Sequence, residues 1–573
     1  SLSKLLLKNK NNILVRYNLA LMQSETNEIE NSIQNYKYIL GIDKDNWKSI
    51  LNLYIIKLRL KKYEESLVLI KNLLEIKPNY QPALRDKAYI FLMQKEPEKG
   101  LKIILESIKQ NKKDYLAINI LGMIYMELGN YELSNQALKE AIRINERYVP
   151  SINNLGRCLV LQHNKSDAKK LFEKVLKIDP TYTDSLTNLA NIYLSEGEYS
   201  KGLKYHFEAD KFDKNNNIIL FNIGCTYSYL EDFKNAEIYY KKSLKIDHNF
   251  QLCKRNLSIL YLRLRNYKKA WSYFDGRIGL DEFRHKNNII HNIKNKLWNG
   301  IDDIKSKKIL IVKEQGVGDE ILYSSMYKDL LLLCPNTKIE CDRRLKNIFC
   351  NSFPDYKNNF VDLGSISENL DSLKKYDFTI YAGSLGRYFR NSREHFDNNN
   401  IFLKADDRLI TEIKGKLNSL KYNYNIGISW RSFKNRYADE KSLNLNNLTN
   451  ILQTQNCNFI NLQYGEVHSE VNKFNQGTDN KIVTLDKLDL FNDFDRLAAV
   501  LMNLDLFISV SNSTAHLAGG LGVKTILIKP KNHALFHYWN QPDNKTPWYK
   551  SVSLIEKNQL VSKKNLLEEN LNL

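Results

Sequence analysis

Two glycines and an acid stand directly after an apolar run in the stretch VKEQGVGDEILYSS, Val312–Ser325. Between a strand and a helix, glycines allow tight turns and let a ligand approach the backbone closely. Three interpretations are open for this stretch: a cradle for phosphate, the floor of an active site, or only a tight turn. The stretch by itself does not separate them, and the elements around it decide.

A second stretch, SNSTAHLAGG beginning at Ser511, carries hydroxyl groups where we expect a helix to start. This helix should begin near Ser513, after the apolar run Leu506–Val510. Backbone amides and the dipole at a helix N-terminus bind diphosphate readily, and Ser513 and Thr514 would add hydroxyl donors. The alternative is an ordinary helix cap, because Ser and Thr are common there. We expect His516 to be a packed helix residue, with a sugar or phosphate contact as the alternative.

Alternating strands and helices must position both stretches. From about Lys307, apolar strand candidates alternate with helical segments, a pattern that favours parallel sheets with crossover helices. The strand candidates are Ile309–Val312, Thr337–Cys341, Phe378–Tyr381, Ile426–Ser429, Phe459–Leu462, Leu506–Val510 and Thr525–Ile528, and the helical segments are Ile321–Leu333 and Asp495–Asn503. The polar segment Lys404–Asn425 divides the strands into two sets. We therefore predict two Rossmann-like halves, residues 307–420 and 421–573, with ligands bound at strand carboxyl ends in the cleft between them.

The N-terminal half of the chain is an array of 34-residue repeats. Two columns of small residues recur at this spacing, twelve residues apart, and Tyr54 is their one exception. The columns are Ala20, Tyr54, Ala88, Gly122, Gly156, Ala190, Gly224 and Ser258, and Ser32, Ser66, Gly100, Ser134, Ala168, Gly202, Ala236 and Ala270. Closely packed antiparallel helices need small residues at their contact, so we predict an α-solenoid over residues 1–274 and a linker at 275–306. Residues 1–12 fit the tail of a further repeat, so we expect the array to begin before residue 1.

A third column lies two positions before the first and is mostly asparagine, interrupted by Asp86 and Ile120. Its asparagines are Asn18, Asn52, Asn154, Asn188, Asn222 and Asn256. An amide side chain offers one acceptor and two donors, so it could clasp a peptide backbone without reading its sequence. We predict that these residues bind an acceptor peptide on the inner surface of the solenoid. The alternative is that asparagine serves local packing between the helices.

Composition limits the classes of protein that fit. The 573 residues are too many for one core, and no apolar run approaches the ~18 residues of a membrane span. Seven dispersed cysteines without zinc-site spacing favour a reducing compartment, so we expect a cytoplasmic protein. The net charge of +20 reflects lysine throughout the chain, without an aromatic–basic RNA motif, so we expect no nucleic-acid partner. No Asp-x-Asp motif stands in a fitting loop, and we expect neither a metal nor a cofactor.

Five motifs in order carry a resemblance to a known family: LWNG, EQGVGDEILYSS, ISWRS, SVSNSTAHLAGGLGVKTILIKP and PWYKSV. Together with the repeats they resemble bacterial tetratricopeptide-repeat proteins with a C-terminal GT-B glycosyltransferase domain. That domain is distantly similar to heptosyltransferases, and the whole architecture is similar to protein O-GlcNAc transferase and to flagellin glycosyltransferases. The resemblance implies an α-solenoid followed by an α/β GT-B fold. It also implies sugar transfer from a nucleotide sugar to Ser/Thr hydroxyls of a protein, such as flagellin, held by the repeats.

The resemblance also implies roles for single residues. Asp319 matches the proposed general base of heptosyltransferases, with Gln315 facing the same cleft, while the alternative is that Asp319 only caps a helix starting at Glu320. Lys441 aligns with a phosphate-contacting cation, and either Lys441 or Arg431 would stabilise the leaving diphosphate in place of a metal. A nucleotide-diphosphate sugar or CMP-sugar would contact Gly316, Gly318, Arg431, Lys441, Gln463, Tyr464, Ser511, Asn512, Ser513, Thr514 and His516.

Two departures from the family pattern keep other functions open. Ser511 stands where relatives carry Asp, and Phe536–Trp539 (FHYW) stands where they carry Asp-Trp-Arg-Trp. Ser511 removes an anionic contact to a sugar hydroxyl or ribose. The alternatives are therefore a glycosyltransferase acting on a glycolipid or polysaccharide, and a non-catalytic repeat scaffold whose transferase domain has decayed.

Overall fold

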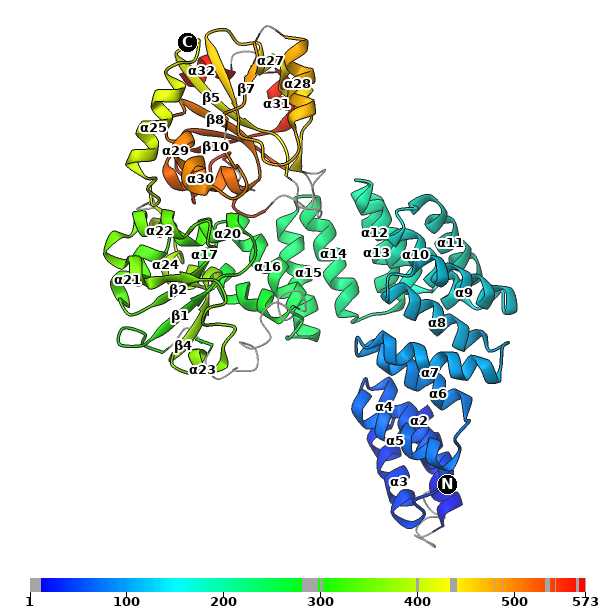
Figure 1. Ribbon diagram of the computed structural model, residues 1–573. Coiled ribbons are helices and arrows are strands. Elements are labelled where there is room, and N and C mark those ends of the chain that lie inside the picture. The colour runs from blue at the N-terminus through cyan, green and yellow to red at the C-terminus, as the bar shows by residue number, and fades with distance from the viewer. Residues whose placement is uncertain are drawn as a thin grey trace. The chain divides into compact units, whose positions relative to one another are not determined.

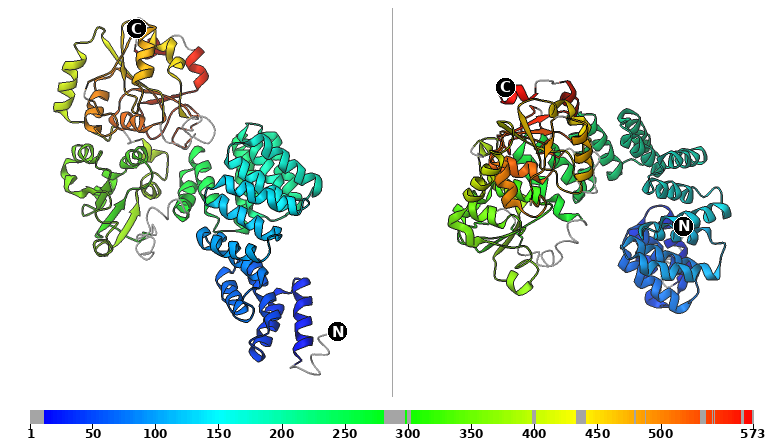
Figure 2. Two further views of the ribbon diagram at one scale, coloured as in Figure 1. Left: turned by 45° about the vertical axis from the view of Figure 1, so that its right-hand side comes forward. Right: turned by 45° about the horizontal axis from the view of Figure 1, so that its top comes forward.

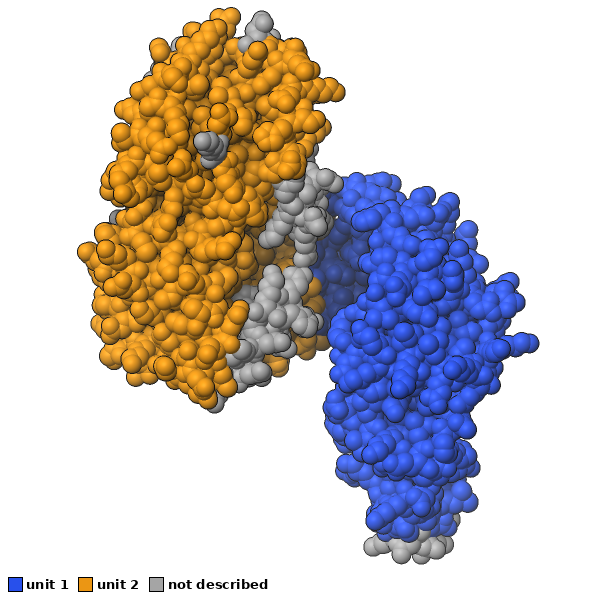
Figure 3. All heavy atoms as spheres, viewed as in Figure 1, with its two compact units in different colours: residues 1–226 blue, residues 227–573 orange. Residues whose placement is uncertain are grey.

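The computed structural model describes residues 12–571 apart from 281–296, 299–301, 398–400, 433–440, 479, 487, 531–535, 540, 542 and 563–565. The chain forms two compact units, residues 1–226 and 227–573 (Figure 3). The first unit is helical, and the second combines further helices with two β-sheets.

Sixteen consecutive helices, α2–α17, are the helix pairs of the predicted α-solenoid, and Figures 1 and 2 show them running from blue to green. Their bounds are α2 Ile13–Glu25, α3 Ile29–Ile42, α4 Trp47–Arg59, α5 Tyr63–Ile76, α6 Gln81–Met93, α7 Pro97–Gln110, α8 Tyr115–Glu127, α9 Tyr131–Ile144, α10 Val149–Leu161, α11 Lys165–Ile178, α12 Thr183–Ser195, α13 Tyr199–Phe212, α14 Asn217–Tyr229, α15 Phe233–Ile246, α16 Gln251–Arg263 and α17 Tyr267–Phe274. A 3₁₀ turn, η1 (Asp275–Gly279), follows α17.

The two columns of small residues lie where paired helices touch. The Ser32 hydroxyl donates to the carbonyl of Ala20 over 2.7 Å, and the Ser134 hydroxyl donates to the carbonyl of Gly122 over 2.8 Å. A Cβ on Gly122 would lie 2.5 Å from Cγ of Leu138, closer than atoms can pack. Small residues therefore fit these contacts, as the repeat spacing predicts, and at the exception, Tyr54, the Ser66 hydroxyl still donates to the Tyr54 carbonyl over 3.2 Å.

The turn inside each helix pair contains one residue with a positive φ, and this position also recurs every 34 residues. These residues are Asn27, Lys61, Lys95, Gly129, His163, Gly197, Glu231 and Arg265. The left-handed conformation ends a helix sharply and favours glycine or asparagine. Because most of the eight are neither, residue type alone does not mark this column in the sequence.

Two parallel sheets make up the α/β region, shown in Figure 1 as a green half and a yellow-to-red half. The first has the order β3-β2-β1-β4, from β1 Ile309–Val312, β2 Lys338–Cys341, β3 Phe360–Asp362 and β4 Phe378–Tyr381. The second has the order β10-β9-β8-β5-β6-β7, from β5 Tyr424–Ser429, β6 Cys457–Asn461, β7 Ile482–Val483, β8 Leu506–Val510, β9 Thr525–Ile528 and β10 Val552–Ile555. The predicted fold class, an α-solenoid followed by two Rossmann-like halves, is confirmed.

Helices and 3₁₀ turns connect the strands. Those of the first half are α20 Val317–Ser324, α21 Tyr327–Leu333, α22 Lys346–Ser352, η3 Pro354–Asn359, α23 Leu370–Leu373, η4 Ala382–Leu385, α24 Gly386–Phe389 and η5 Glu394–Phe396. Those of the second half are α25 Asp407–Leu417, η6 Leu445–Leu448, α27 Thr449–Leu452, α28 His468–Gln476, α29 Phe494–Leu501, α30 Ser513–Leu521, α31 Lys557–Ser562 and α32 Leu566–Leu571. The helix expected over Ile321–Leu333 is in fact two helices, α20 and α21. The domain boundaries expected at residues 274, 306 and 420 stay predictions.

Candidate functional site

Each sheet has a point where its strand order reverses. In the first sheet β1 pairs with both β2 and β4, and in the second β5 pairs with both β6 and β8. Connections on the two sides of such a point leave the sheet in opposite directions, so a crevice opens at the strand carboxyl ends. The stretch after β1 and the stretch after β8 lie at these two points. The topology therefore places both sequence stretches where α/β proteins bind ligands.

The helices that follow these strands, α20 and α30, contact each other. A Cβ on Gly318 would lie 2.7 Å from Cδ2 of His516, so only glycine permits this approach without displacing the imidazole. The close contact explains Gly318 by packing against the other half rather than by a backbone turn. The starts of the two helices, and the positive ends of their dipoles, are brought together here.

His516 is buried among aromatic side chains. Its Nδ1 lies 2.8 Å from the hydroxyl of Tyr549, and the ring centroids of Trp539 and Tyr538 lie 4.9 and 5.0 Å away. Burial, with the positive charge of Lys441 as a further cause, lowers the pKa of His516 to about 3. The imidazole is therefore neutral at pH 7 and serves as a packed helix residue.

Asp319 is half-buried at the third position of α20. Its Oδ2 accepts the backbone N–H of Gly316 over 3.1 Å. It also hydrogen-bonds to Tyr538, whose pKa is raised well above its usual value by burial and further by the nearby Asp319 charge. The helix begins at Val317, so the alternative, in which Asp319 is the N-cap of a helix from Glu320, does not hold. Asp319 instead reaches back to the true N-cap, Gly316, and stays close to the second half through Tyr538.

The tight turn after β1 is made by Gln315. Gln315 has a φ of 60°, while Gly316 is extended with a φ of −92°. The expectation that the glycines supply the turn is therefore wrong, because the left-handed residue is the exposed Gln315. Non-glycine residues of the repeat turns adopt the same conformation, so by itself it indicates a tight turn.

The loop from β8 into α30 is held by neutral hydrogen bonds. Asn512 is the N-cap: its Oδ1 accepts the N–H of Ala515 over 3.0 Å, and its amide donates to the Ser429 hydroxyl over 2.8 Å. Ser511 accepts the indole N–H of Trp539 over 3.1 Å. Helix α30 begins at Ser513, as expected. The side chains of Ser511 and Asn512 thus shape the loop from within.

Ser513 and Thr514 are the first two residues of α30. Ser513 is half-buried, whereas Thr514 is buried. Their backbone N–H groups belong to the first turn of the helix, where no preceding turn accepts them. They remain candidates for contacts with an anion at this N-terminus.

The two predicted cations have different surroundings. Lys441 is 8% exposed, and its Nζ lies 4.4 Å from the ring centroid of Phe536. Arg431 donates to Glu470 over 2.9 Å, and the same carboxylate accepts the indole N–H of Trp430 over 3.3 Å. Lys441 and Arg431 both stay predicted contacts for a leaving diphosphate, and the guanidinium of Arg431 is paired with Glu470.

Gln463 points into its own half of the protein. Its Oε1 accepts the backbone N–H groups of Trp430 and Arg431 over 2.8 and 2.6 Å, and only 1% of the residue is exposed. The side chain thus braces the turn after β5, and the nucleotide-sugar contact expected of it stays a prediction. Tyr464 is half-buried, with its ring centroid 6.3 Å from that of Phe491.

Sequence reasoning missed the aromatic enclosure of His516 by Tyr538, Trp539 and Tyr549. The run FHYW was visible as a departure from the family pattern, but its contact with α30 was not. It also missed Glu314, a buried carboxylate that precedes Gln315. The only available signal was an acid two residues after the end of an apolar strand.

The asparagine column makes contacts between neighbouring repeats. The amides of Asn154 and Asn188 donate over 3.0 Å to the side-chain oxygens of Asn119 and Asn153, each in the preceding repeat. These are contacts that the packing alternative predicts. Asn52 similarly donates to the Tyr17 hydroxyl over 2.8 Å. Asn18 is exposed, and Asn222 and Asn256 are half-buried.

None of the helices described is both long and apolar enough to cross a bilayer. Within the same part of the chain, no group of three or more His, Cys, Asp or Glu side chains could hold a metal ion.

Comparison with known families confirms the repeats. Tetratricopeptide repeat profiles match residues 116–148, 149–182 and 219–250, and a further profile of this repeat matches residues 171–204. Tetratricopeptide repeats bind protein partners, so the array marks the chain as a protein-interaction scaffold.

Among known proteins, the chain is similar to Protein FlbA of Caulobacter vibrioides, with 27% identity over 270 residues. The match covers 44% of this chain and 44% of FlbA, so it spans less than half of that protein. A tetratricopeptide repeat protein from Parabacteroides merdae is 16% identical, with a TM-score of 0.38, over 43% of this chain and 98% of its own. The structure of PilF from Pseudomonas aeruginosa is 21% identical, with a TM-score of 0.30, over 36% and 94%.

Proposed function

We propose that the α/β region is a GT-B glycosyltransferase that moves a sugar from a nucleotide-sugar donor to Ser/Thr hydroxyls of a protein. The observation that carries the proposal is the approach of α20 and α30 at Gly318 and His516. It brings the two strand-reversal points together, with the Asp319 carboxylate between them. An anionic donor and a proton-accepting group are both needed for this reaction, and this arrangement offers a place for each.

In the proposed reaction Asp319 takes the proton of the acceptor hydroxyl as its oxygen attacks the anomeric carbon. The new C–O bond forms while the bond from that carbon to the nucleotide phosphate oxygen breaks, and the nucleotide leaves with the electron pair. The first turn of α30 and Lys441 would stabilise the negative charge of the leaving group. No metal is required in this scheme, so EDTA should leave transfer intact, and loss restored by Mg²⁺ or Mn²⁺ would contradict it.

The repeats would hold the acceptor protein. A scaffold that binds proteins, joined to a transferase, keeps a Ser or Thr of the bound chain near the cleft and raises its effective concentration. Flagellin is the acceptor that the family resemblance implies. A cytoplasmic location belongs to the same proposal, because nucleotide sugars are made there.

A non-catalytic scaffold is the second candidate. The observation that favours it is the Ser511 hydroxyl held by Trp539 at the position where relatives carry an acid. Loss of that acid would remove one donor contact while the fold remains intact.

Nucleotide binding separates the two candidates. Melting of the full chain is followed with UDP, GDP, CMP, ADP and dTDP, and with the Lys441→Ala variant as the matched control. A nucleotide at about one hundred times its Kd adds about 2.7 kcal/mol to the stability of the folded state. We expect one nucleotide to raise the melting temperature of the wild type and to raise that of the variant less. No shift with any of them would favour the scaffold.

A further inference from the structure

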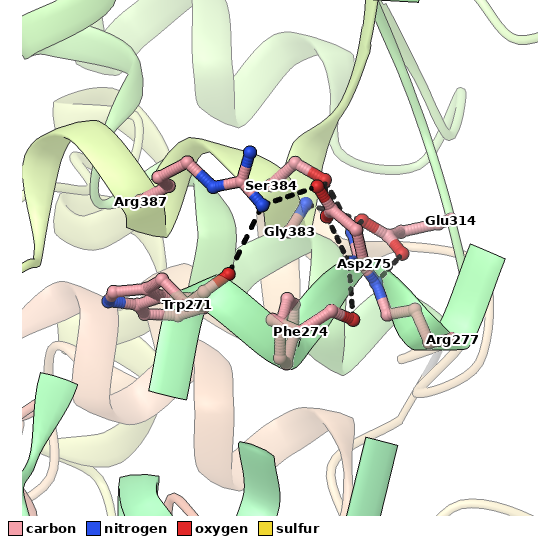
Figure 4. Close-up of polar contacts among 8 residues, drawn as sticks. All are labelled: Trp271, Phe274, Asp275, Arg277, Glu314, Gly383, Ser384 and Arg387. Atoms are coloured by element: carbon pink, nitrogen blue, oxygen red, sulfur yellow. Dashed lines mark hydrogen bonds and ion pairs between the residues drawn. The ribbon is translucent and has the colours of Figure 1, made fainter. Parts of the chain in front are cut away.

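A buried ion pair links η1 to the loop between β1 and α20 (Figure 4). Arg277 lies in η1, and Glu314 follows β1. The guanidinium donates to both carboxylate oxygens, with Nε–Oε2 and Nη2–Oε1 distances of 2.7 Å, and the side chains are 4% and 0% exposed. This bidentate geometry fixes the orientation of the carboxylate.

The turn after β4 contributes a second anchor. The backbone N–H of Gly383 donates to Oε1 of Glu314. A Cβ on Gly383 would lie 2.6 Å from that oxygen and 3.0 Å from Nη2 of Arg277, so only glycine lets the backbone come this close. Glu314 is thus held by η1 from one side and by the first sheet from the other.

Helix α17 and η1 are themselves docked on the first half. The indole N–H of Trp271 donates to the carbonyl of Arg390 over 2.7 Å, and the indole fills the space beside Gly386. Asp275 accepts the hydroxyl of Ser384 over 2.8 Å, and Figure 4 shows both side chains beside the ion pair. The last helix of the array therefore meets the first half through a fixed contact.

The anchored residue is followed at once by the left-handed turn. Gln315 has a φ of 60°, and Gly316 then gives its N–H to Asp319. A strained residue persists only where its neighbours hold it. Here Glu314 holds one side of Gln315, and the first turn of α20 holds the other.

We propose that Arg277 is a positioning residue that acts on Asp319 through Glu314. By fixing the Glu314 carboxylate, it keeps Gln315 in its left-handed conformation and sets the direction in which α20 presents Asp319. Any movement of the last helix pair that shifts Arg277 would then reach the proposed base. The claim that Arg277 orders the loop from Glu314 to Asp319 is independent of the proposed function. Its consequence for catalysis rests on the proposed function.

The test is amide hydrogen exchange of the full chain, followed by mass spectrometry on peptides that cover residues 313–324. Arg277→Met removes the guanidinium. Arg277→Lys keeps the positive charge but cannot donate two parallel hydrogen bonds to the Glu314 carboxylate. Arg387→Met is the matched control, because Arg387 donates to Asp275 over 2.8 Å in the same cluster, whereas the Glu314 carboxylate is held by Arg277 and Gly383.

We expect exchange in residues 313–324 to be about tenfold faster in Arg277→Met, less so in Arg277→Lys, and unchanged in Arg387→Met. Peptides of the second sheet should exchange as in the wild type. Unchanged exchange in residues 313–324 of Arg277→Met would overturn the proposal. If Arg277→Met does not fold, Arg277→Lys is measured instead, and unchanged exchange in residues 313–324 of that variant would overturn the proposal.

Transfer kinetics test the consequence for catalysis. Arg277→Lys should lower kcat on the order of 10–100-fold at unchanged donor Kd and melting temperature, as for a misplaced base, while Arg387→Met keeps wild-type kcat. Equal losses in the two variants would overturn the positioning role. A wild type that transfers no sugar would refute the proposed function alone, since the exchange result still decides whether Arg277 orders the loop.

Discussion

The two strand-to-helix loops of the candidate site are held by different kinds of contact. The loop from β1 into α20 depends on a buried ion pair, Glu314 with Arg277, and Arg277 comes from outside the sheet. The loop from β8 into α30 depends on neutral groups of its own half, with Asn512 bonded to Ser429. A shift of the preceding helices therefore affects the first loop directly, whereas the second loop holds its conformation by itself.

This difference predicts unequal losses of stability when the main side-chain contact of each loop is removed. Glu314→Ala removes the bidentate partner of the buried Arg277 guanidinium, which keeps only the contact of its Nη1 with Asp275 at 3.0 Å. We expect unfolding of the α/β region to become easier by about 3 kcal/mol, the lower end for a broken buried pair. Chemical denaturation followed by Trp fluorescence measures this free energy of unfolding. Trp271 lies next to η1, and four further tryptophans, Trp298, Trp430, Trp539 and Trp548, lie in the α/β region. A loss below about 1 kcal/mol, the value of an exposed pair, would show that the pair is not an anchor.

The cations of the second half allow a sharper comparison at the proposed donor site. Lys441→Ala should weaken nucleotide binding by roughly ten- to hundredfold, or about 1.5–3 kcal/mol, since one charge-assisted contact is lost. Arg431→Ala should change the affinity less, because Glu470 already pairs with that guanidinium. Titration calorimetry with the nucleotide that raises the melting temperature compares the two variants. The reverse order would assign the phosphate contact to Arg431.

The smallest effect is expected at the neutral loop. Asn512→Ala removes an N-cap and the bond to Ser429, and we expect a loss of about 0.5–2 kcal/mol. Ser429→Ala is the matched control, since it keeps the N-cap but removes the bond to Asn512 together with the hydrogen bond from the Ser429 hydroxyl to Gln463. If Asn512→Ala costs as much as Glu314→Ala in the same denaturation experiment, the contrast between charged and neutral anchors does not hold.

The regular elements were predictable because their signals are local. The strands Ile309–Val312, Phe378–Tyr381, Leu506–Val510 and Thr525–Ile528 agree with the structure residue for residue, since buried parallel strands read as short apolar runs. Strands β3, β7 and β10 were missed. The first two have only three and two residues, too few for such a run, and in β10 the exposed Ser553 interrupts the apolar residues. The 34-residue spacing of small residues identified the helix pairs because each contact needs them.

Contacts between distant segments could not be read from the sequence. Arg277 and Glu314 are 37 residues apart and carry no shared motif. Gly318 looked like a turn residue, but its small size is required by His516, which lies almost 200 positions further along the chain. Gln315 shows that even a turn can be misassigned, since the anchored Glu314 forces a left-handed conformation onto a residue that does not prefer it.

The central claim, that Asp319 is the general base of a glycosyltransferase, is tested most directly by Asp319→Asn. Asparagine keeps an oxygen that can accept the Gly316 N–H, so stability and nucleotide affinity should stay unchanged. It cannot take up a proton from the acceptor, so turnover at saturating donor should fall by about 10²–10⁴-fold. Turnover within about tenfold of the wild type, below that range, at an unchanged melting temperature would contradict the claim and leave Asp319 as a helix-capping residue.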